Sequence, residues 1–469
     1  MRTSGLFNIL FLTSAFFVLG GFAVQAHARD AAKEQELLRT IELQQGQLEA
    51  QQKQLDAQRK MLEEIQSQTQ KLLENAQQEV DRLGDVVQQQ QQQLESLQRQ
   101  VSESQPPADK ATVAADVPEA FEVRPVDKIV TSGGGERIKL AISGHVNRAV
   151  QVRDDGEDTD LYHVDNDNSE SQVRFVGTAE VDEDLTLGTT IEVSIAPNIS
   201  GQVDQNNQET GDIFDERKVE VTLDSKRWGK LWMGKGYTAS YTAGAVDLSK
   251  TTSISYSTIV DTAGSHLFRD SSSGDLTNLR IFEAFNAFDG LNRRNRLRYD
   301  TPRFGGFHFA TSAVSDNRYD ASLWWGGQGY GFKAGAAAAF ADPNQDDADF
   351  QYNGSASILH EDTGLNLSLS FGLLERDNQD DQQNYFAKVG WLRRFFDFGD
   401  TAFSVDYTRS LNLPTDEDDG YSIAAAAVQQ FDKFGAEVYG LYRLHSLDRG
   451  VEPDVDDITV ITLGTRVNF

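Results

Sequence analysis

Strict alternation of apolar and polar residues recurs between residues 136 and 469, and this feature constrains the fold more than any other. In residues 364–373, leucine or phenylalanine occupies every second position, and asparagine, serine or glycine lies between them. Successive side chains of a strand point to opposite faces, so each such segment has one apolar and one polar face. The segments are joined alternately by short turns and by longer, mostly acidic loops. There are seven short turns and eight long loops. The pattern predicts sixteen antiparallel strands.

These strands allow two architectures. A soluble β-sandwich or β-solenoid would put the apolar faces inside, whereas a membrane barrel puts water inside and lipid outside. An even number of strands with alternately short and long connections favours the barrel. A closed barrel also leaves no strand edge unpaired, as lipid requires. We therefore expect an all-β transmembrane protein, a 16-stranded antiparallel outer-membrane β-barrel over residues 136–469.

The hairpin at residues 292–309 illustrates both faces. Arg294, Arg296 and Arg298 lie on one side of an extended strand, and Leu297 and Tyr299 lie on the other. Three arginines on one face of a strand need contact with water, because burying an unpaired charge is costly. The arginines are therefore expected to face the lumen, and by the same opposition of faces so is Arg174. An alternative is that nearby acids neutralise them, so that they only rigidify the wall.

The first residues carry an export pattern. Arg2 precedes an apolar run over residues 6–24, and Ala26-His27-Ala28 ends it with small residues. This predicts a signal peptide over residues 1–28. The alternative is an N-terminal membrane anchor.

Residues 29–101 predict an α-helical coiled coil in the periplasm. The segment lacks proline, and Ile41, Leu48, Leu55 and Leu62 recur every seven residues. Glutamines at core positions weaken the seam, and a solitary or disordered polar segment is the alternative. Residues 102–135 contain four prolines and a Ser-Gly-Gly-Gly run, which predict a flexible linker.

Composition excludes several function classes. A net charge of −30 without a basic patch argues against nucleic acid. The chain has no cysteine, and its seven histidines show no paired ligand spacing, so we expect no metal. Because nucleophile elbows and nucleotide-binding glycine loops are also missing from the sequence, we expect neither an enzyme nor a cofactor.

Four motifs together resemble trimeric sixteen-stranded Gram-negative porins. These are residues 171–180 (SQVRFVGTAE), 230–236 (KLWMGKG), 296–309 (RLRYDTPRFGGFHF) and Phe469. The added coiled coil resembles the DcaP-like branch, which is associated with uptake of dicarboxylic and aromatic acids. The resemblance implies a homotrimer in contact with outer-membrane lipid and lipopolysaccharide, and it implies that the barrel-assembly machinery reads Phe469.

The resemblance also implies a pore constriction. The long connection at residues 238–291 would fold into the lumen, and Lys235 would join Arg174, Arg294, Arg296 and Arg298 as its cationic wall. Acids of the loop would form the opposing side: Asp261, Asp270, Asp275, Glu283 and Asp289. Guanidinium groups in a narrow water path attract anions and pair with carboxylates.

The sequence therefore predicts a porin for passive diffusion of small hydrophilic solutes, preferring anions such as carboxylates and dicarboxylates. One alternative is a structural tether, in which the coiled coil contacts peptidoglycan and the barrel is a closed anchor. Another is a trimeric adhesin with one barrel shared by three chains, which sixteen strands in a single chain disfavour.

Overall fold

The computed structural model describes residues 129–130, 138–211, 214–344 and 348–469. The chain divides into two units, Met1–Lys110 and Ala111–Phe469, and every described residue belongs to the second. The predicted signal peptide, the coiled coil and most of the linker lie outside the described residues. Within the predicted linker, Ile129–Val130 forms the short strand β1. Among the described residues, no helix is both long and apolar enough to cross a membrane.

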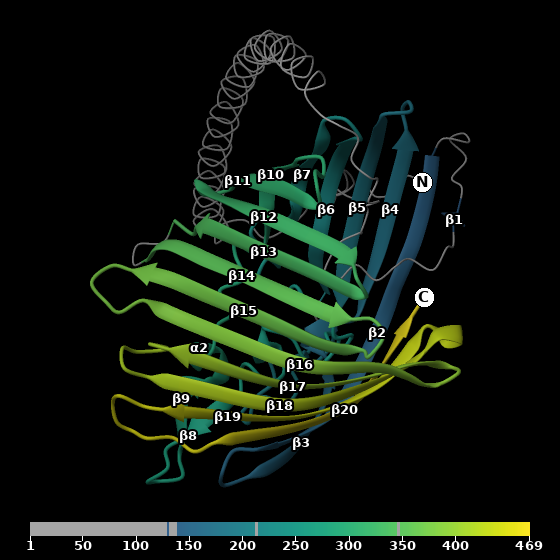
Figure 1. Ribbon diagram of the computed structural model, residues 1–469. Coiled ribbons are helices and arrows are strands. Elements are labelled where there is room, and N and C mark those ends of the chain that lie inside the picture. Colours follow the sequence, from purple (N-terminus) through teal and green to yellow (C-terminus); the bar gives the residue numbers. More distant parts are fainter. Residues whose placement is uncertain (1–128, 131–137, 212–213, 345–347) are drawn as a thin grey trace, which may run out of the picture. The chain divides into compact units, whose positions relative to one another are not determined.

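Antiparallel strands make up most of the described residues (Figure 1). The first group of strands is β2 (Ile138–Asp154), β3 (Thr159–Asp165), β4 (Gln172–Glu180), β5 (Leu185–Ile195), β6 (Phe214–Ser225) and β7 (Gly229–Tyr237). The second group is β10 (Arg293–Asp300), β11 (Phe307–Val314), β12 (Arg318–Gly329), β13 (Phe332–Asp342), β14 (Ala348–His360) and β15 (Leu365–Arg376). The third group is β16 (Gln382–Phe396), β17 (Gly399–Leu411), β18 (Asp419–Phe431), β19 (Ala436–Asp448) and β20 (Ile458–Asn468).

The strands close into a barrel of sixteen positions, as the sequence predicts. The sheet contains eighteen strands, of which β1 pairs with only two residues of β2. Strands β3 and β4 pair with successive parts of β2 and so share one position, interrupted by the 3-10 helix η1 (Asp167–Ser169). Pairing of β2 with β20, from His145 opposite Asn468 to Asp154 opposite Thr459, closes the ring.

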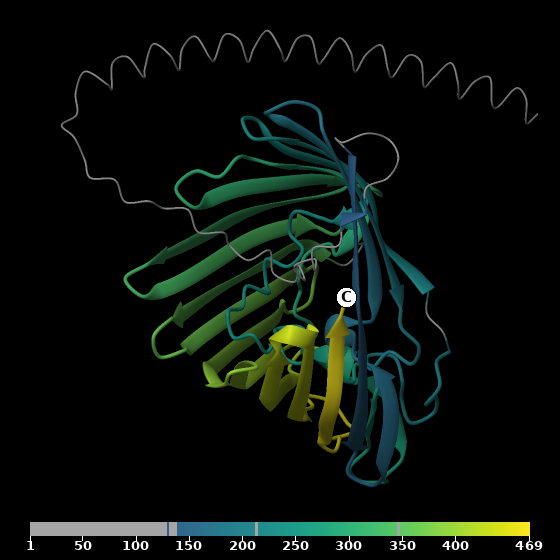
Figure 2. The same ribbon diagram turned by 90° about the vertical axis from the view of Figure 1, so that its right-hand side faces the viewer.

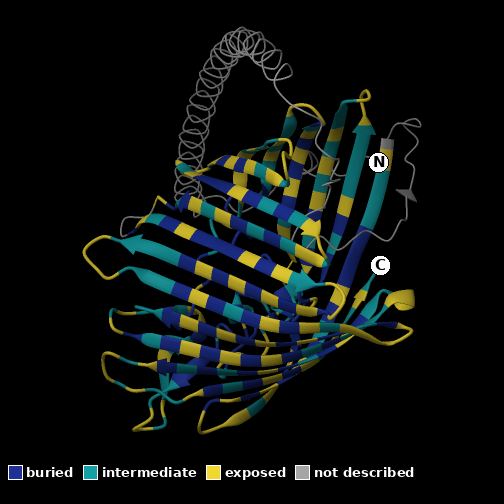
Figure 3. Cartoon of the chain, in the orientation of Figure 1, coloured by how far each residue is buried: buried dark blue, intermediate teal, exposed yellow. Residues whose placement is uncertain are grey.

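Buried and exposed residues alternate along the strands of the wall, which gives the banding in Figure 3. The exposed residues are mostly apolar, and the buried residues between them are mostly polar or small. In β15, Leu367 is 40% exposed while the neighbouring Ser368 is 2% exposed. The polar face is covered because it looks into the barrel, and the apolar face is open because lipid, not protein, would cover it. The alternation read from residues 364–373 is thus confirmed.

Residues 238–291, between β7 and β10, run through the space enclosed by the wall (Figure 2). This segment, which we call the lumen loop, contains η2 (Ile259–Asp261), β8 (Leu267–Arg269), β9 (Leu276–Arg280) and α2 (Ile281–Ala284). Its apolar residues form buried contacts with the inner wall. Phe268, Ile281 and Phe285 pack against Phe386 of β16 and Leu447 of β19. Burial of these side chains against the inner wall stabilises the loop in the lumen.

Candidate functional site

Hydrogen bonds and an ion pair anchor the lumen loop to the inner wall at several points along its length. Near its start, the backbone and hydroxyl of Ser240 donate to the Asp320 carboxylate of β12. In its middle, Asp247 pairs with Lys388 of β16 at 2.6 Å. Near its end, Asp289 accepts from Asn353 of β14 at 2.9 Å. The loop is therefore a fixed part of the lumen wall.

A cavity of about 840 Å³, the main cavity, lies between the loop and the wall. Its lining includes Arg293 at the start of β10, where the long connections meet the wall, and Lys333 and Leu359 beside short turns at the opposite end. The lining thus reaches both ends of the wall, as a path for solutes requires.

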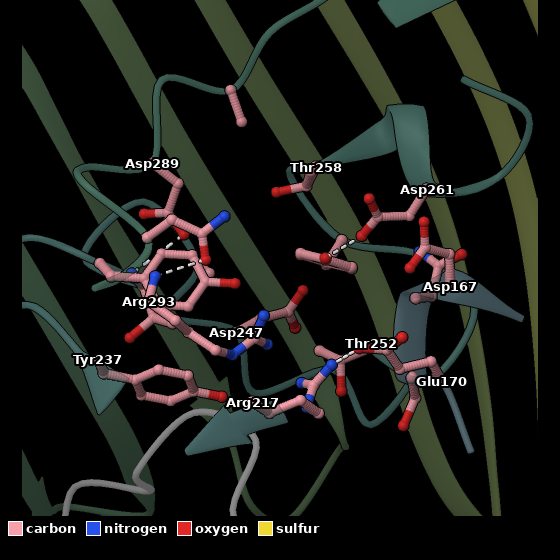
Figure 4. A pocket seen from close by; sticks show the side chains of 18 of the residues that line it. Asp167, Glu170, Arg217, Tyr237, Asp247, Thr252, Thr258, Asp261, Asp289 and Arg293 are labelled. Carbon is pink, nitrogen blue, oxygen red and sulfur yellow. Dashed lines mark hydrogen bonds and ion pairs between the residues drawn. The ribbon is translucent and has the colours of Figure 1, made fainter. Parts of the chain in front are cut away.

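Four arginines of the wall line the main cavity, and Figure 4 labels two of them, Arg217 and Arg293. Arg217 is the extra residue of a β-bulge, because the β5–β6 register shifts between Glu192 and Val193. It pairs with Glu170 and, at 2.8 Å, with Glu192. A bulge re-aims a side chain that alternation would otherwise send to the other face.

Arg293 follows Asn292, whose φ of 62° turns the chain at the start of β10. Its guanidinium carbon lies 5.3 Å from the ring centroid of Tyr237 and 5.4 Å from that of Tyr241. Among the described residues it forms no ion pair. Two aromatic faces therefore hold this cation, and its charge is available to a solute.

Five acidic residues line the same cavity: Asp167 of η1, Glu170, and Asp247, Asp261 and Asp289 of the lumen loop. Asp167 and Asp261 lie across the cavity from Arg293, whereas Asp289 lies on the same side as Arg293 (Figure 4). The Tyr256 hydroxyl donates to Asp261. Burial raises the pKa of Asp261 to about 7 and that of Asp289 to about 6. The main cavity thus lies between fixed cations and weakly ionised acids.

A second cavity, of about 340 Å³, lies beside the short turns and shares Arg174, Tyr237, Tyr241 and Thr242 with the first. We call it the short-turn cavity. Two acidic residues, Glu220 and Asp300, line it. Six cationic residues line it: Arg174, Lys218, Lys230, Arg296, Arg298 and Arg303. Cations outnumber acids there, so its field favours anions.

Three of the predicted wall residues line these cavities, and each has an acidic partner. Arg174 lies 2.6 Å from Glu192, Arg296 lies 2.6 Å from Glu220, and Arg298 lies 2.7 Å from Asp300. These pairs correspond to the alternative in which neighbouring acids neutralise the arginines. The excess positive charge of the two cavities therefore comes from the remaining cations, which include Arg293 and Arg303.

Two other predicted wall cations are misplaced in the sequence analysis. Lys235 pairs in register with Val219 of β6, whose side chain is on the lipid-facing side, and it lies 3.5 Å from Glu216. Inward and outward side chains still alternate at this point of β7, so Lys235 faces outward. The inward position that the resemblance implied for Lys235 is wrong. Arg294 is exposed and lines neither cavity, because the turn at Asn292 brings Arg293 into the lumen in its place.

Of the predicted loop acids, Asp261 and Asp289 line the main cavity, whereas Asp270, Asp275 and Glu283 line neither cavity. Asp270 and Asp275 flank the turn between β8 and β9, and Asp270 bridges to Val455 in the β19–β20 connection. Glu283 accepts from the backbone of Arg280 and caps α2. In an irregular loop, alternate residues do not point to fixed faces. The sequence of the lumen loop therefore does not show which of these five acids line the cavity.

Nothing in the sequence pattern singles out Arg217, Arg293 or Asp167. A β-bulge places Arg217, and the break between β3 and β4 places Asp167. Neither the bulge nor the break has a distinct signal in the sequence. Asn292 before Arg293 is a partial signal, since asparagine tolerates positive φ.

Phe469, the predicted assembly signal, lies at the barrel seam. Its backbone exchanges two hydrogen bonds of 2.9 Å with Gly144 of β2. Its proposed recognition during assembly stays a prediction.

Comparison with known proteins identifies the class of barrel. The profile described as "Gram-negative porin" matches residues 113–449. Among solved structures, OmpT of Vibrio cholerae superposes with a TM-score of 0.50 at 12% identity, covering 73% of this chain and 100% of that one. An anion-selective porin from Comamonas acidovorans gives 0.48 at 16% identity, covering 71% and 100%. The outer membrane channel DcaP of Acinetobacter baumannii gives 0.47 at 11% identity, covering 72% and 99%. No curated protein matches the sequence.

Proposed function

The chain belongs to the Gram-negative porin family, and from that premise we propose that it passes small hydrophilic anions, carboxylates and dicarboxylates above all, across the outer membrane. The family and the closed barrel indicate a channel rather than an enzyme, located in the outer membrane. What goes beyond the family is the preference for anions.

The lining of the short-turn cavity carries this proposal. Six cations against two acids in a cavity of about 340 Å³ raise the local concentration of anions. Arg296 and Arg298 are paired and act chiefly as donors of oriented hydrogen bonds, whereas Arg303 forms no ion pair among the described residues. A carboxylate moving along the wall can exchange one guanidinium for the next without losing its hydrogen bonds.

The main cavity supports the same preference through Arg293. This cation lies between two phenol rings, so it needs no carboxylate of its own. Across the cavity, Asp261 is only partly ionised near neutral pH, since its pKa is about 7. A solute therefore meets a full positive charge on one side and a reduced negative charge on the other.

A planar-bilayer experiment under a salt gradient tests the proposal, using the full-length protein purified from membranes. We expect open channels with a reversal potential on the anion side. Liposome swelling should then be faster with succinate than with an equally long diamine. A cation-side reversal potential would overturn the anion preference, and a bilayer without any conductance would favour the closed tether.

The homotrimer, lipopolysaccharide contact, barrel-assembly machinery and peptidoglycan stay predictions. They do not affect the selectivity argument, which depends only on residues within one barrel.

A further inference from the structure

Two carboxyl groups from separate elements meet at one side of the main cavity (Figure 4). Asp167 comes from η1, in the break between β3 and β4, and Asp261 comes from η2 of the lumen loop. Ser200 joins them: its hydroxyl accepts from the Asp167 backbone at 3.0 Å and donates to the Asp261 carbonyl at 2.6 Å. We call these two residues the acid pair.

The acid pair has no cationic partner of its own. Neither carboxylate forms an ion pair with any described residue, although both line the same cavity. Within the described part of the chain, the Tyr256 hydroxyl is the one side chain that donates a hydrogen bond to the Asp261 carboxylate. Two acids held together without a cation cannot both ionise easily, so they tend to keep one proton between them.

Other charged and titratable groups around the acid pair are fixed by different partners. Arg217 of β6 binds Glu170 and Glu192, and Arg293 of β10 lies between Tyr237 and Tyr241. Asp165 of β3 lies 3.6 Å from Arg148 and accepts from Ser171. Asp289 accepts from the backbone of Thr242 and Gly244. The acid pair is therefore the least compensated acidic group facing the cavity.

Burial is the main cause that raises the pKa of Asp261, to about 7. A raised carboxyl pKa means that the proton is kept below neutral pH and lost as the pH rises through about 7.

Resting on the proposed anion channel, we propose that Asp167 and Asp261 determine how strongly the pore prefers anions, by holding or releasing one shared proton opposite Arg217 and Arg293. With the proton held, this side of the cavity carries one negative charge and offers an O–H donor to a passing carboxylate. With the proton lost, it carries two negative charges and repels the same solute. Anion preference therefore falls as the pH rises.

The reversal potential of the full-length channel under a fixed potassium chloride gradient, recorded from about pH 5 to about pH 9, tests this proposal. We expect the wild-type ratio of anion to cation permeability to fall about twofold across a step near neutral pH. Asp261→Asn should remove the step and keep the higher ratio throughout. Asp167→Asn, made separately, should do the same, so the test does not depend on one variant folding.

Asp275→Asn is the matched control, because it removes an exposed carboxyl of the same loop that lines neither cavity. It should keep the wild-type step. A step that persists in both acid-pair variants, or is missing from the wild type, would overturn the proposal. If the wild type is anion-selective in that case, the proposed function still stands; cation selectivity at every pH would instead remove the proposed function itself.

Discussion

Lys388 Nζ lies 2.6 Å from the Asp247 carboxylate, with side chains 0% and 4% exposed. The pair joins β16 to the middle of the lumen loop, and Lys388 also donates to the Ser255 carbonyl and the Thr251 hydroxyl. With Ser249, whose hydroxyl lies 3.4 Å away, one ammonium group thus contacts four residues of the loop. Removing one partner of a buried ion pair leaves an uncompensated charge, which typically costs about 3–5 kcal/mol.

Lys388→Met should release the lumen loop from β16. We expect noisier single-channel currents with a larger maximum conductance, because the loop no longer keeps one position in the lumen. Lys139→Met is the control: its partner Glu180 is exposed, and exposed pairs contribute about 0–1 kcal/mol. Equal noise in the two variants would contradict the anchoring role of Lys388.

Glu192→Gln should raise anion preference and lower stability together. The Glu192 carboxylate is fully buried and lies within 4 Å of Arg174, Arg217 and Lys218, at 2.6, 2.8 and 3.8 Å. The amide keeps the shape but leaves three cations without that negative charge. Reversal potential and the temperature of heat-induced unfolding in detergent would measure the two effects. A variant with an unchanged reversal potential would show that these cations do not act on the solute path.

Gly144→Ala should impair closure of the barrel. A Cβ at Gly144 would lie 2.7 Å from the Phe469 ring and would also meet the Gln172 carbonyl, at the seam where β2 receives both neighbours. We expect a lower fraction of folded, heat-modifiable protein in membrane extracts. Gly329→Ala, where a Cβ would meet nothing within 4 Å, should fold normally. Normal folding of both variants would contradict a tight seam.

Most of the fold could be predicted from the sequence, because a lipid-facing wall imposes a period of two on every strand. The inward faces of Arg174, Arg296 and Arg298 follow from that period alone. Lys235 shows the limit of resemblance, since its own strand's alternation puts it on the outer face, opposite Val219.

The candidate site was harder to predict, because its charges come from departures from regularity. Arg217 reaches the cavity through a bulge whose position depends on the register of β5 with β6. Asp167 sits in the break between β3 and β4, and Arg293 follows a residue with positive φ. Each of these depends on pairing between distant segments, which alternation within one segment does not encode.

The central claim, that lumen cations without their own acid set the anion preference, is tested most directly at two neighbouring arginines. Arg293 lies in the main cavity between Tyr237 and Tyr241, whereas Arg294 is exposed and lines neither cavity. The decisive measurement is the reversal potential of Arg293→Gln and Arg294→Gln in the same salt gradient. We expect Arg293→Gln to lower the anion-to-cation permeability ratio about twofold and Arg294→Gln to leave it unchanged. Equal effects of the two substitutions, or no effect of Arg293→Gln, would contradict the claim.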